Sequence, residues 1–396
     1  MGPVTGVLAP YGVPAAYDTL MRGWRSHRLG PVRVYPYLEY DGIYRTNIFQ
    51  TSTDKKSDWV NAINPGVRIE LPIAGRHRFS AGYLGNYFFY SRYSRQNHLD
   101  HNANVDLAFN FRGGLSLRFG NTLRAATEER SAVTYRQRDY LREVPYLLAT
   151  YRLSDRWKMQ AAYIFDLLEF AKWVDRDNNY REHTGGLTLY YRFWPKTAAL
   201  AQYIVSGRTY PYDAFGNNIT HSGLLGLTWD PTAKLTGTVK FGFTIKDYER
   251  TLPGRDNTPA SWLMSMQTLY RFSNYTTLTL TAQHSLQEDV DLDANNAYRN
   301  TGLFVSLNHN WHYINAVLYA AMSYTNNSYL NDDIEPVTGL LKRREDNIFS
   351  VGGGISRPFT PYFRLRLDYQ FANKASNFAT YSYNEHKVLV GVQSSF

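Results

Sequence analysis

Apolar and polar residues alternate along most of this chain. The clearest example is the segment 363–371, where aromatic or aliphatic residues occupy every odd position and polar residues every even position. Successive side chains on a β-strand point to opposite faces, so this period of two predicts a strand with one apolar and one polar face. The segment 387–396 repeats the pattern, and its apolar face consists of Val388, Val390, Val392 and Phe396.

Turns and loops divide the alternating segments in a regular way. Short turns recur about every 40 residues, at 72–76, 112–114, 154–156, 194–196, 230–234, 273–274, 312–314 and 360–361. Longer polar segments lie between them, at 46–57, 94–102, 126–142, 171–182, 209–219, 251–260, 289–296, 329–345 and 375–383. Short turns at one end of the strands and long loops at the other are typical of outer-membrane barrels. We therefore predict an all-β fold: a transmembrane antiparallel up-and-down β-barrel of about 18 strands, with short periplasmic turns and long extracellular loops.

A soluble β-sandwich is the alternative fold for such strands. It would bury each apolar face against a second sheet and leave each polar face in water. So many strands in two sheets would also need protected edges, and nearly every polar face here carries charge. No run of about 18 apolar residues is present, which excludes helical membrane spans. The mean hydropathy of −0.44 suits a barrel in which half of each strand faces water, and we favour that fold.

Aromatic residues are unusually frequent, with 33 Tyr, 21 Phe and 8 Trp. Several lie beside the short turns: Trp157, Trp194, Tyr275, Trp311, Tyr362 and Phe396. Others flank the long loops: Tyr87, Phe89, Trp173, Tyr248 and Trp262. These positions predict two aromatic belts separated by one membrane thickness. The ordinary preference of aromatic residues for strands is the simpler alternative.

Residues 1–31 are predicted to form a leader that precedes the barrel at 32–396. Pro14 introduces a segment with helical spacing, Ala15–Leu29, which ends at Gly30 and Pro31. This segment is either a short surface helix or disordered leader, or a plug on the periplasmic side of the pore. Residues 1–31 lack the apolar core of a secretion signal. A place in the outer membrane of a Gram-negative cell therefore requires that a signal has been removed.

The polar faces of the strands predict which charges line the lumen that a barrel of this size encloses. The basic residues on these faces are Arg68, Arg118, Arg124, Arg152, Lys158, Arg192, Lys240, Lys246, Arg364 and Arg366. The acidic residues are Glu39, Glu70, Asp106 and Asp368. This basic excess, in a chain of net charge +9, indicates an anionic substrate held by repeated weak contacts. The alternative is that the charges pair with one another and order the wall.

Two segments resemble metal sites only in part. His98, Asp100 and His101 lie in a predicted external loop, where solvated side chains are the simpler interpretation. The segment 289–295 alternates acidic residues as a calcium loop does, but it lacks the Gly and the Glu of that motif, so only a loose cation site remains. The chain has no cysteine and no motif of a serine hydrolase, a P-loop or a dinucleotide site. We therefore predict no catalytic residue, no metal, no cofactor and no enzymatic activity. The basic residues form no run, so no nucleic-acid partner is expected.

The opening of the predicted barrel carries a family resemblance. It contains the segment 36–47, with sequence PYLEYDGIYRTN, followed by KSDWV at 56–60 and NPGV at 64–67. These motifs resemble the start of the putative β-barrel porin 2 family, the EpsL-like outer-membrane barrels encoded with exopolysaccharide operons. The family usually has Asp-Asn before Ile-Tyr, whereas this chain has Asp41-Gly42. The final strand resembles the signal read by the barrel assembly machinery, although Ser394 stands where a larger apolar residue is common.

This resemblance implies an outer-membrane pore that exports an exopolysaccharide, which the basic lumen suggests is anionic. The expected partners are the polysaccharide, a periplasmic polysaccharide-export protein, the barrel assembly machinery, and outer-membrane lipid with lipopolysaccharide. One alternative is a general or substrate-specific uptake porin, which a large loop folded into the lumen would favour. Another is a barrel that transports nothing, such as an adhesin or a sheath around a redox partner.

Overall fold

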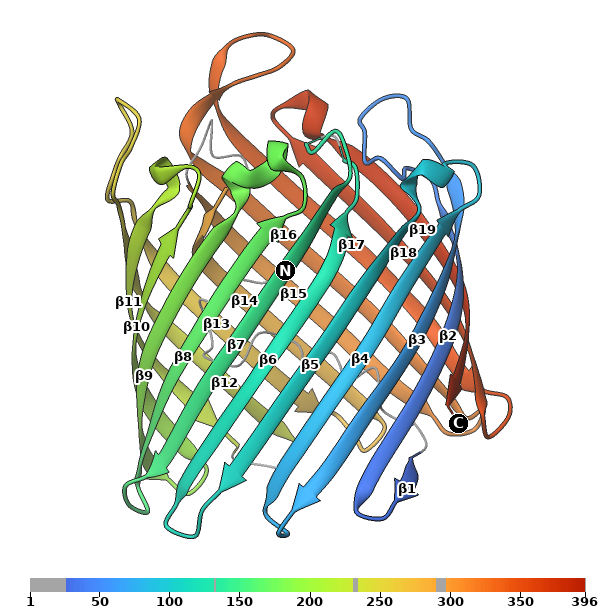
Figure 1. The fold of residues 1–396 in the computed structure, drawn as a ribbon, viewed down its shortest axis with the longest axis vertical. Coiled ribbons are helices and arrows are strands. Elements are labelled where there is room, and N and C mark those ends of the chain that lie inside the picture. Colours follow the sequence, from blue (N-terminus) through green and yellow to red (C-terminus); the bar gives the residue numbers. More distant parts are fainter. Residues whose placement is uncertain (1–25, 132, 231–233, 290–296, 396) are drawn as a thin grey trace.

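The computed structural model describes residues 26–131, 133–230, 234–289 and 297–395. Their strands form one closed cylinder of antiparallel strands (Figure 1). Of the 19 strands in the sheet, β1 (His27–Leu29) is a three-residue addition, so 18 strands make the barrel wall. The wall closes because β2 (Val32–Arg45) pairs both with β3 (Asp58–Ile73) and with the last strand, β19 (Tyr383–Ser395). The predicted fold is confirmed, and within the described ranges no second sheet packs against the apolar faces.

Each remaining strand pairs with its neighbours in chain order. They are β4 (His77–Tyr90), β5 (His98–Asn110), β6 (Leu115–Glu128), β7 (Arg138–Arg152), β8 (Trp157–Phe170), β9 (Tyr180–Trp194), β10 (Thr197–Thr209), β11 (Asn218–Trp229), β12 (Leu235–Tyr248), β13 (Ala260–Arg271), β14 (Thr276–Glu288), β15 (Ala297–Trp311), β16 (Ala316–Ile334), β17 (Leu341–Pro358) and β18 (Phe363–Ser376). Short 3-10 turns occur in four long loops, as η2 (Ser94–Gln96), η3 (Trp173–Asn178), η4 (Ala214–Gly216) and η5 (Ala379–Tyr381). Among the described residues, no helix has the length and apolar composition needed to cross a bilayer.

The short turns lie at one end of the barrel and the long loops at the other, as predicted (Figure 1). Several of the predicted loops are too long, however. Strand β5 already begins at His98, β7 begins at Arg138, and β16 continues to Ile334. The ends of these strands lie near the extracellular loops, where polar residues such as His101 and Asp139 also occupy the outer face. Because the alternation fades there, the sequence pattern resembles that of a loop.

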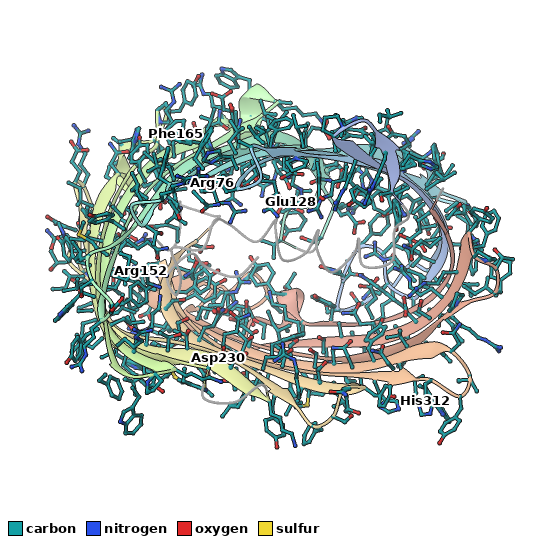
Figure 2. All side chains as sticks on the ribbon, turned by 90° about the horizontal axis from the view of Figure 1, so that it is seen from below. Arg76, Glu128, Arg152, Phe165, Asp230 and His312 are labelled. Carbon is teal, nitrogen blue, oxygen red and sulfur yellow. The ribbon has the colours of Figure 1, made fainter. Side chains whose placement is uncertain are left out.

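The alternation of side chains separates an apolar outside from a polar inside. Leu365, Leu367 and Val390 are 46%, 51% and 48% exposed on the outer surface. The residues that alternate with them on β18, Arg366 and Asp368, point inward and form an ion pair, and Arg366 also contacts Glu39. Figure 2, seen from below, shows Phe165 on the outside of the wall and Arg152 on its inner side. On the final strand, Val388 and Val390 point outward as expected, while Phe396 lies outside the described residues.

Most of the predicted belt residues are on the outer surface. The belt beside the short turns includes Trp157, Trp194, Tyr275, Trp311 and Tyr362, all at least 41% exposed. Beside the long loops, Phe89, Trp173 and Trp262 are exposed as well. The assignment of Tyr248 to the outer belt is wrong, because this residue is 3% exposed and donates a hydrogen bond to Glu288 on the inner wall. Tyr248 lies two residues after Lys246 on β12, so both side chains point to the inner face.

The predicted leader is described only from Ser26 onward, so a plug or a helix over 15–25 lies outside the described residues. The end of that segment differs from the expected helix. His27–Leu29 forms strand β1, which pairs with the start of β2 through a tight turn. Gly30 has a φ of +63° in this turn. That left-handed conformation is readily available to glycine, which explains why the chain reverses here.

A repeated hydrogen bond marks the outer surface towards the extracellular end. In four hairpins an outward tyrosine hydroxyl lies 2.7–2.9 Å from the Nδ1 atom of a histidine on the next strand. These outer-surface Tyr–His pairs are Tyr83 with His101, Tyr163 with His183, Tyr203 with His221, and Tyr369 with His386. Each histidine is the fourth residue of its strand, so all four pairs lie at a similar height on the barrel.

Candidate functional site

The candidate site is the inner wall of the barrel. The predicted basic residues all fall on the inward parity of their strands: Arg68 on β3, Arg118 and Arg124 on β6, Arg152 on β7, Lys158 on β8, Arg192 on β9, Lys240 and Lys246 on β12, and Arg364 and Arg366 on β18. Their placement follows from strand register alone, because every second side chain points to the lumen. That they line a substrate path stays a prediction.

Many of these cations form ion pairs with carboxylates of the inner wall. Arg366 contacts Glu39, Asp41 and Asp368 at 3.0, 3.3 and 2.8 Å. These partners come from β2 and β18, which lie on either side of the closing strand β19. The contacts therefore tie the closing strands together across the inner wall.

Two further pairs have the same character. Arg118 lies 2.5 Å from Asp106, and Arg68 lies 2.5 Å from Glu70. Arg118 and Asp106 are inward side chains of the adjacent strands β6 and β5, and Arg68 and Glu70 are inward side chains of β3. These residues therefore fit the alternative prediction, in which the charges of the lumen pair with one another and order the wall, better than a free basic surface.

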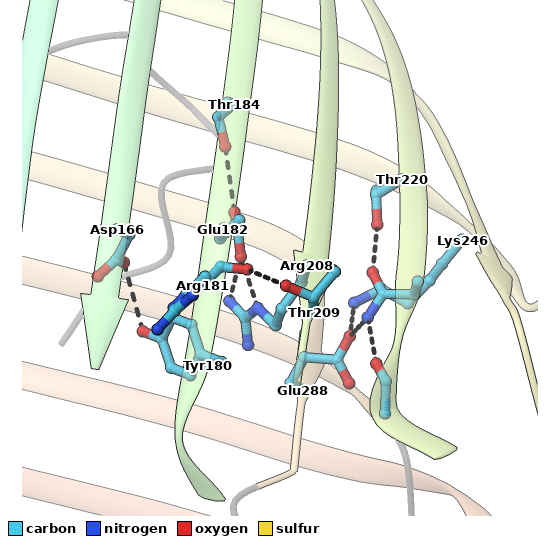
Figure 3. Close-up of polar contacts among 12 residues, drawn as sticks. Asp166, Tyr180, Arg181, Glu182, Thr184, Arg208, Thr209, Thr220, Lys246 and Glu288 are labelled. Atoms are coloured by element: carbon cyan, nitrogen blue, oxygen red, sulfur yellow. Dashed lines mark hydrogen bonds and ion pairs between the residues drawn. The ribbon is translucent and has the colours of Figure 1, made fainter. Parts of the chain in front are cut away.

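A second set of ion pairs lies on the inner wall between β9 and β14, near the extracellular ends of these strands (Figure 3). Arg208 contacts Glu182 at 2.5 Å, and Lys246 contacts Glu288. Tyr248 also donates a hydrogen bond of 3.0 Å to Glu288. Glu182 and Glu288 were not among the predicted lumen residues. The sequence pattern places Glu182 in a loop, although it shares the parity of Thr184 and Thr188 on β9, and that parity is the signal for its inward position.

The loop between β6 and β7, residues 129–137, is described at 129–131 and 133–137, and these residues fold inward at the extracellular mouth. Its first residue, Glu129, lies 2.7 Å from Arg45 and accepts a hydrogen bond of 2.9 Å from Tyr90. Arg45 also contacts Glu385 of β19 at 2.6 Å. Burial would raise the pKa of Glu129, but the neighbouring Arg45 guanidinium outweighs it and holds that pKa below its ordinary value. We call this contact the Arg45–Glu129 latch.

The 129–137 loop narrows the lumen. A cavity of about 400 Å³ lies between this loop and the opposite wall. Its lining includes Ser131 and Arg136 on one side and Tyr298, Arg344 and Lys374 on the other. Further contacts hold the end of the loop, since Arg136 pairs with Asp175 at 2.6 Å. The extracellular mouth is thus smaller than the barrel cross-section.

Unpaired cations gather at the opposite, periplasmic end. Arg152, Lys158 and Arg192 line a cavity of about 280 Å³. The Lys158 ammonium lies 4.0 Å from the ring centroid of Tyr190. Within the described chain, none of the three cations has a carboxylate within ion-pair distance, and only Asp155 of the adjoining turn brings an acidic group to the cavity lining. We call this group the periplasmic cation cluster.

A sequence comparison identifies the family. The family described as "Putative beta-barrel porin 2" matches residues 26–396, which is nearly the whole chain. This chain belongs to that porin family. It is an outer-membrane β-barrel porin, and the resemblance of its opening motifs is confirmed. No curated protein matches the sequence of this porin.

Solved structures agree with the fold of this porin. It aligns with the outer membrane protein OpdK from Pseudomonas aeruginosa at a TM-score of 0.52 and 11% identity, over 92% of this chain and 99% of that one. A further crystal structure from the same organism, of OccK1 (OpdK), aligns at a TM-score of 0.51 and 12% identity with the same coverage. Identities this low establish a shared fold and nothing more specific.

The three residues of one candidate metal site, His98, Asp100 and His101, lie on opposite faces of β5. His98 and Asp100 are buried on the inward parity of β5, whereas His101 points outward to Tyr83. The prediction that this segment is an external loop is therefore wrong. Side chains on opposite faces of a strand cannot share one ion. Across the described ranges, no group of three His, Cys, Asp or Glu residues is arranged to hold a metal. The calcium-like segment after Asp289 lies outside those ranges.

Proposed function

We propose that this porin is a selective channel that admits small anionic solutes through the outer membrane. The observation that carries the proposal is the periplasmic cation cluster. Five of the other seven predicted lumen cations face carboxylates, whereas Arg152, Lys158 and Arg192 gather at the periplasmic exit without one in the described chain. Low-dielectric walls around a cluster of one sign focus its field and raise the local concentration of the opposite ion.

The extracellular mouth favours small solutes over a thick polymer. The inward 129–137 loop leaves a cavity of about 400 Å³ there, which is within the usual size of small-molecule sites. A fixed loop inside the lumen is also the feature expected of an uptake porin. The direction of net flux then follows the concentration gradient of the solute.

Ion selectivity in planar bilayers tests the proposal. Reversal potentials in a KCl gradient should show anion selectivity for the unmodified porin. The triple variant Arg152→Gln, Lys158→Gln, Arg192→Gln should lose most of it, because the focusing charges are gone. Arg112→Gln is the control, since Arg112 is a cation of a periplasmic turn that does not line the cluster cavity. Cation selectivity of the unmodified porin would contradict the proposal.

Export of an anionic exopolysaccharide is the second candidate. The observation that favours it is the number of tyrosine rings on the inner wall, including Tyr146, Tyr180, Tyr190, Tyr298 and Tyr329. Such rings are rigid, amphipathic platforms against which sugar faces can pack. This function would need a periplasmic polysaccharide-export protein behind the barrel. Insertion by the barrel assembly machinery, and contact with outer-membrane lipid and lipopolysaccharide, belong to either function.

A deletion strain separates the two candidates. Loss of the porin should slow the uptake of small acidic solutes and leave surface polysaccharide unchanged if the channel proposal is correct. Polysaccharide retained in the periplasm, with solute uptake unaffected, would instead support export.

A further inference from the structure

A second, larger cavity lies among the extracellular loops. Its volume is about 710 Å³, and its walls come from the β2–β3 loop, the β4–β5 loop, the 129–137 loop and Thr380 of the β18–β19 loop. Neither Arg45 nor Glu129 of the latch lines it. The volume falls within the range of small-ligand sites. We call it the outer-loop cavity.

The outer-loop cavity carries a surplus of positive charge. Lys56 is satisfied by Asp54 at 2.5 Å, and the Arg130 guanidinium lies 4.6 Å from the ring centroid of Phe49. Arg92 and Arg95 are exposed, and neither guanidinium has a carboxylate partner in the described part of the chain. The planar guanidinium matches a carboxylate with two parallel hydrogen bonds. The two arginines therefore offer a carboxylate site that the protein itself leaves unfilled.

The rest of the lining suits a sugar. Phe49 and Tyr93 pack edge to face with ring centroids 5.3 Å apart. The Tyr135 ring is 62% exposed at the same cavity. Aromatic rings of this kind provide apolar area at low entropic cost, and Tyr adds a polar end. Hydroxyl groups also line the cavity, from Thr51, Ser94 and other Ser and Thr residues, and each can both donate and accept a hydrogen bond.

The backbone of two wall residues is held in an unfavourable conformation. Tyr135 has a φ of +53° and Asp54 a φ of +50°. For residues other than glycine, and for a bulky ring above all, this left-handed region is sparsely populated, and such residues concentrate at ligand-binding sites. The Tyr135 amide donates a 3.0 Å hydrogen bond to the Ser131 carbonyl, which helps to fix this conformation.

We infer that the outer-loop cavity binds an acidic sugar, with Arg92 and Arg95 on its carboxylate and Tyr93 and Tyr135 against its ring. The inference does not depend on what crosses the lumen, because none of the periplasmic cation cluster contributes to this cavity. It assigns the extracellular loops a recognition role that is separate from conduction.

Binding of trigalacturonate to the purified full-length porin in detergent tests the inference. Calorimetry should detect binding of trigalacturonate and none of maltotriose, its neutral counterpart in size. The double variant Arg92→Gln, Arg95→Gln should weaken binding about tenfold or more, since each loses a charged hydrogen bond. Arg176→Gln is the matched control, because Arg176 is an extracellular arginine that packs on Trp173 outside this cavity.

Further variants and competition by phosphate test the same site. The triple variant of the periplasmic cation cluster should bind trigalacturonate as the unmodified porin does. Tyr135→Gly, which removes the ring and suits the left-handed backbone, should weaken binding without loss of the folded barrel on a heat-modifiability gel. Equal binding by the Arg92/Arg95 variant would overturn the site. Inorganic phosphate that displaces trigalacturonate at equal concentration would overturn the recognition of the sugar.

Discussion

Arg45 illustrates what one buried charge does in this wall. Its guanidinium contacts Glu129 and Glu385, and the side chain is 6% exposed. Removing one partner from a buried ion pair leaves an uncompensated charge, which is strongly destabilising. Arg45 thus couples the position of the 129–137 loop to the strand pairing that closes the barrel.

Neutralising Glu129 should release the 129–137 loop. Glu129 has a lowered pKa in the folded protein, so its contact with Arg45 is fully stabilising above the ordinary value of 4.5 and is lost as pH falls through the lowered value. Single-channel conductance should therefore rise in acid below that ordinary value. Glu129→Gln should show the higher conductance already at neutral pH. Asp177→Asn, an exposed carboxylate of the β8–β9 loop, is the control. A conductance that does not change with Glu129→Gln would argue against the latch.

Gly42 accounts for the departure from the family motif at Asp41-Gly42. A Cβ atom at this position would lie 2.5 Å from the Trp59 ring, which packs across the neighbouring strand. Trp59 is 42% exposed on the outer surface. In this porin the glycine leaves room for the indole at the membrane interface, so a larger residue at position 42 requires the ring to move.

At the scale of the element, four hairpins each carry one of the outer-surface Tyr–His pairs. In each pair the tyrosine and the histidine are diagonal neighbours on adjacent strands. The hydrogen bond joins them on a surface that faces lipid or lipid headgroups. Polar groups at that depth cost free energy when they are left unpaired. The pairs therefore allow histidine to occupy the outer face.

Tyr203→Phe tests the contribution of one pair. The change removes the 2.7 Å hydrogen bond to His221 and should lower the free energy of unfolding by about 0.5–1.5 kcal/mol. Urea unfolding in lipid vesicles, followed by tryptophan fluorescence, measures it. Tyr313→Phe is the control, because Tyr313 is 83% exposed in a periplasmic turn and its hydroxyl makes no hydrogen bond within the described chain. Equal costs for both variants would deny the pair a stabilising role.

The sequence predicts the elements well where one face meets lipid and the other meets water. Leu365 and Arg366 illustrate this, since their order alone places one outside and the other inside. The prediction fails near the extracellular loops, where His98 and Glu182 belong to strands although the sequence pattern places them in loops. There polar residues such as His101 and His183 also occupy the outer face, so alternation distinguishes a strand less clearly. The sequence also cannot foresee the Arg45–Glu129 contact, because it depends on how a loop folds back over strands distant in sequence.

At the scale of the whole molecule, the outer face must match the bilayer. Val390→Arg puts a charge on the lipid-facing side of β19, where it should cost about 2–4 kcal/mol near the middle of the membrane. Leu389→Arg is the control, because it points inward opposite Asp368. The fraction that migrates as folded barrel in cold SDS should fall for Val390→Arg and change little for Leu389→Arg. The opposite ranking would mean that the two faces are assigned the wrong way round.

The pairing of β2 with β19 has a consequence for biogenesis. It joins residues about as far apart as the chain permits; the His386 amide, for example, donates to the Thr46 hydroxyl 340 positions away. A fragment that lacks either end loses this closing pair of strands. A chain truncated before its last strand would present two bare sheet edges, which template aggregation. Closure of the native barrel therefore waits until the final strand, β19, has been made.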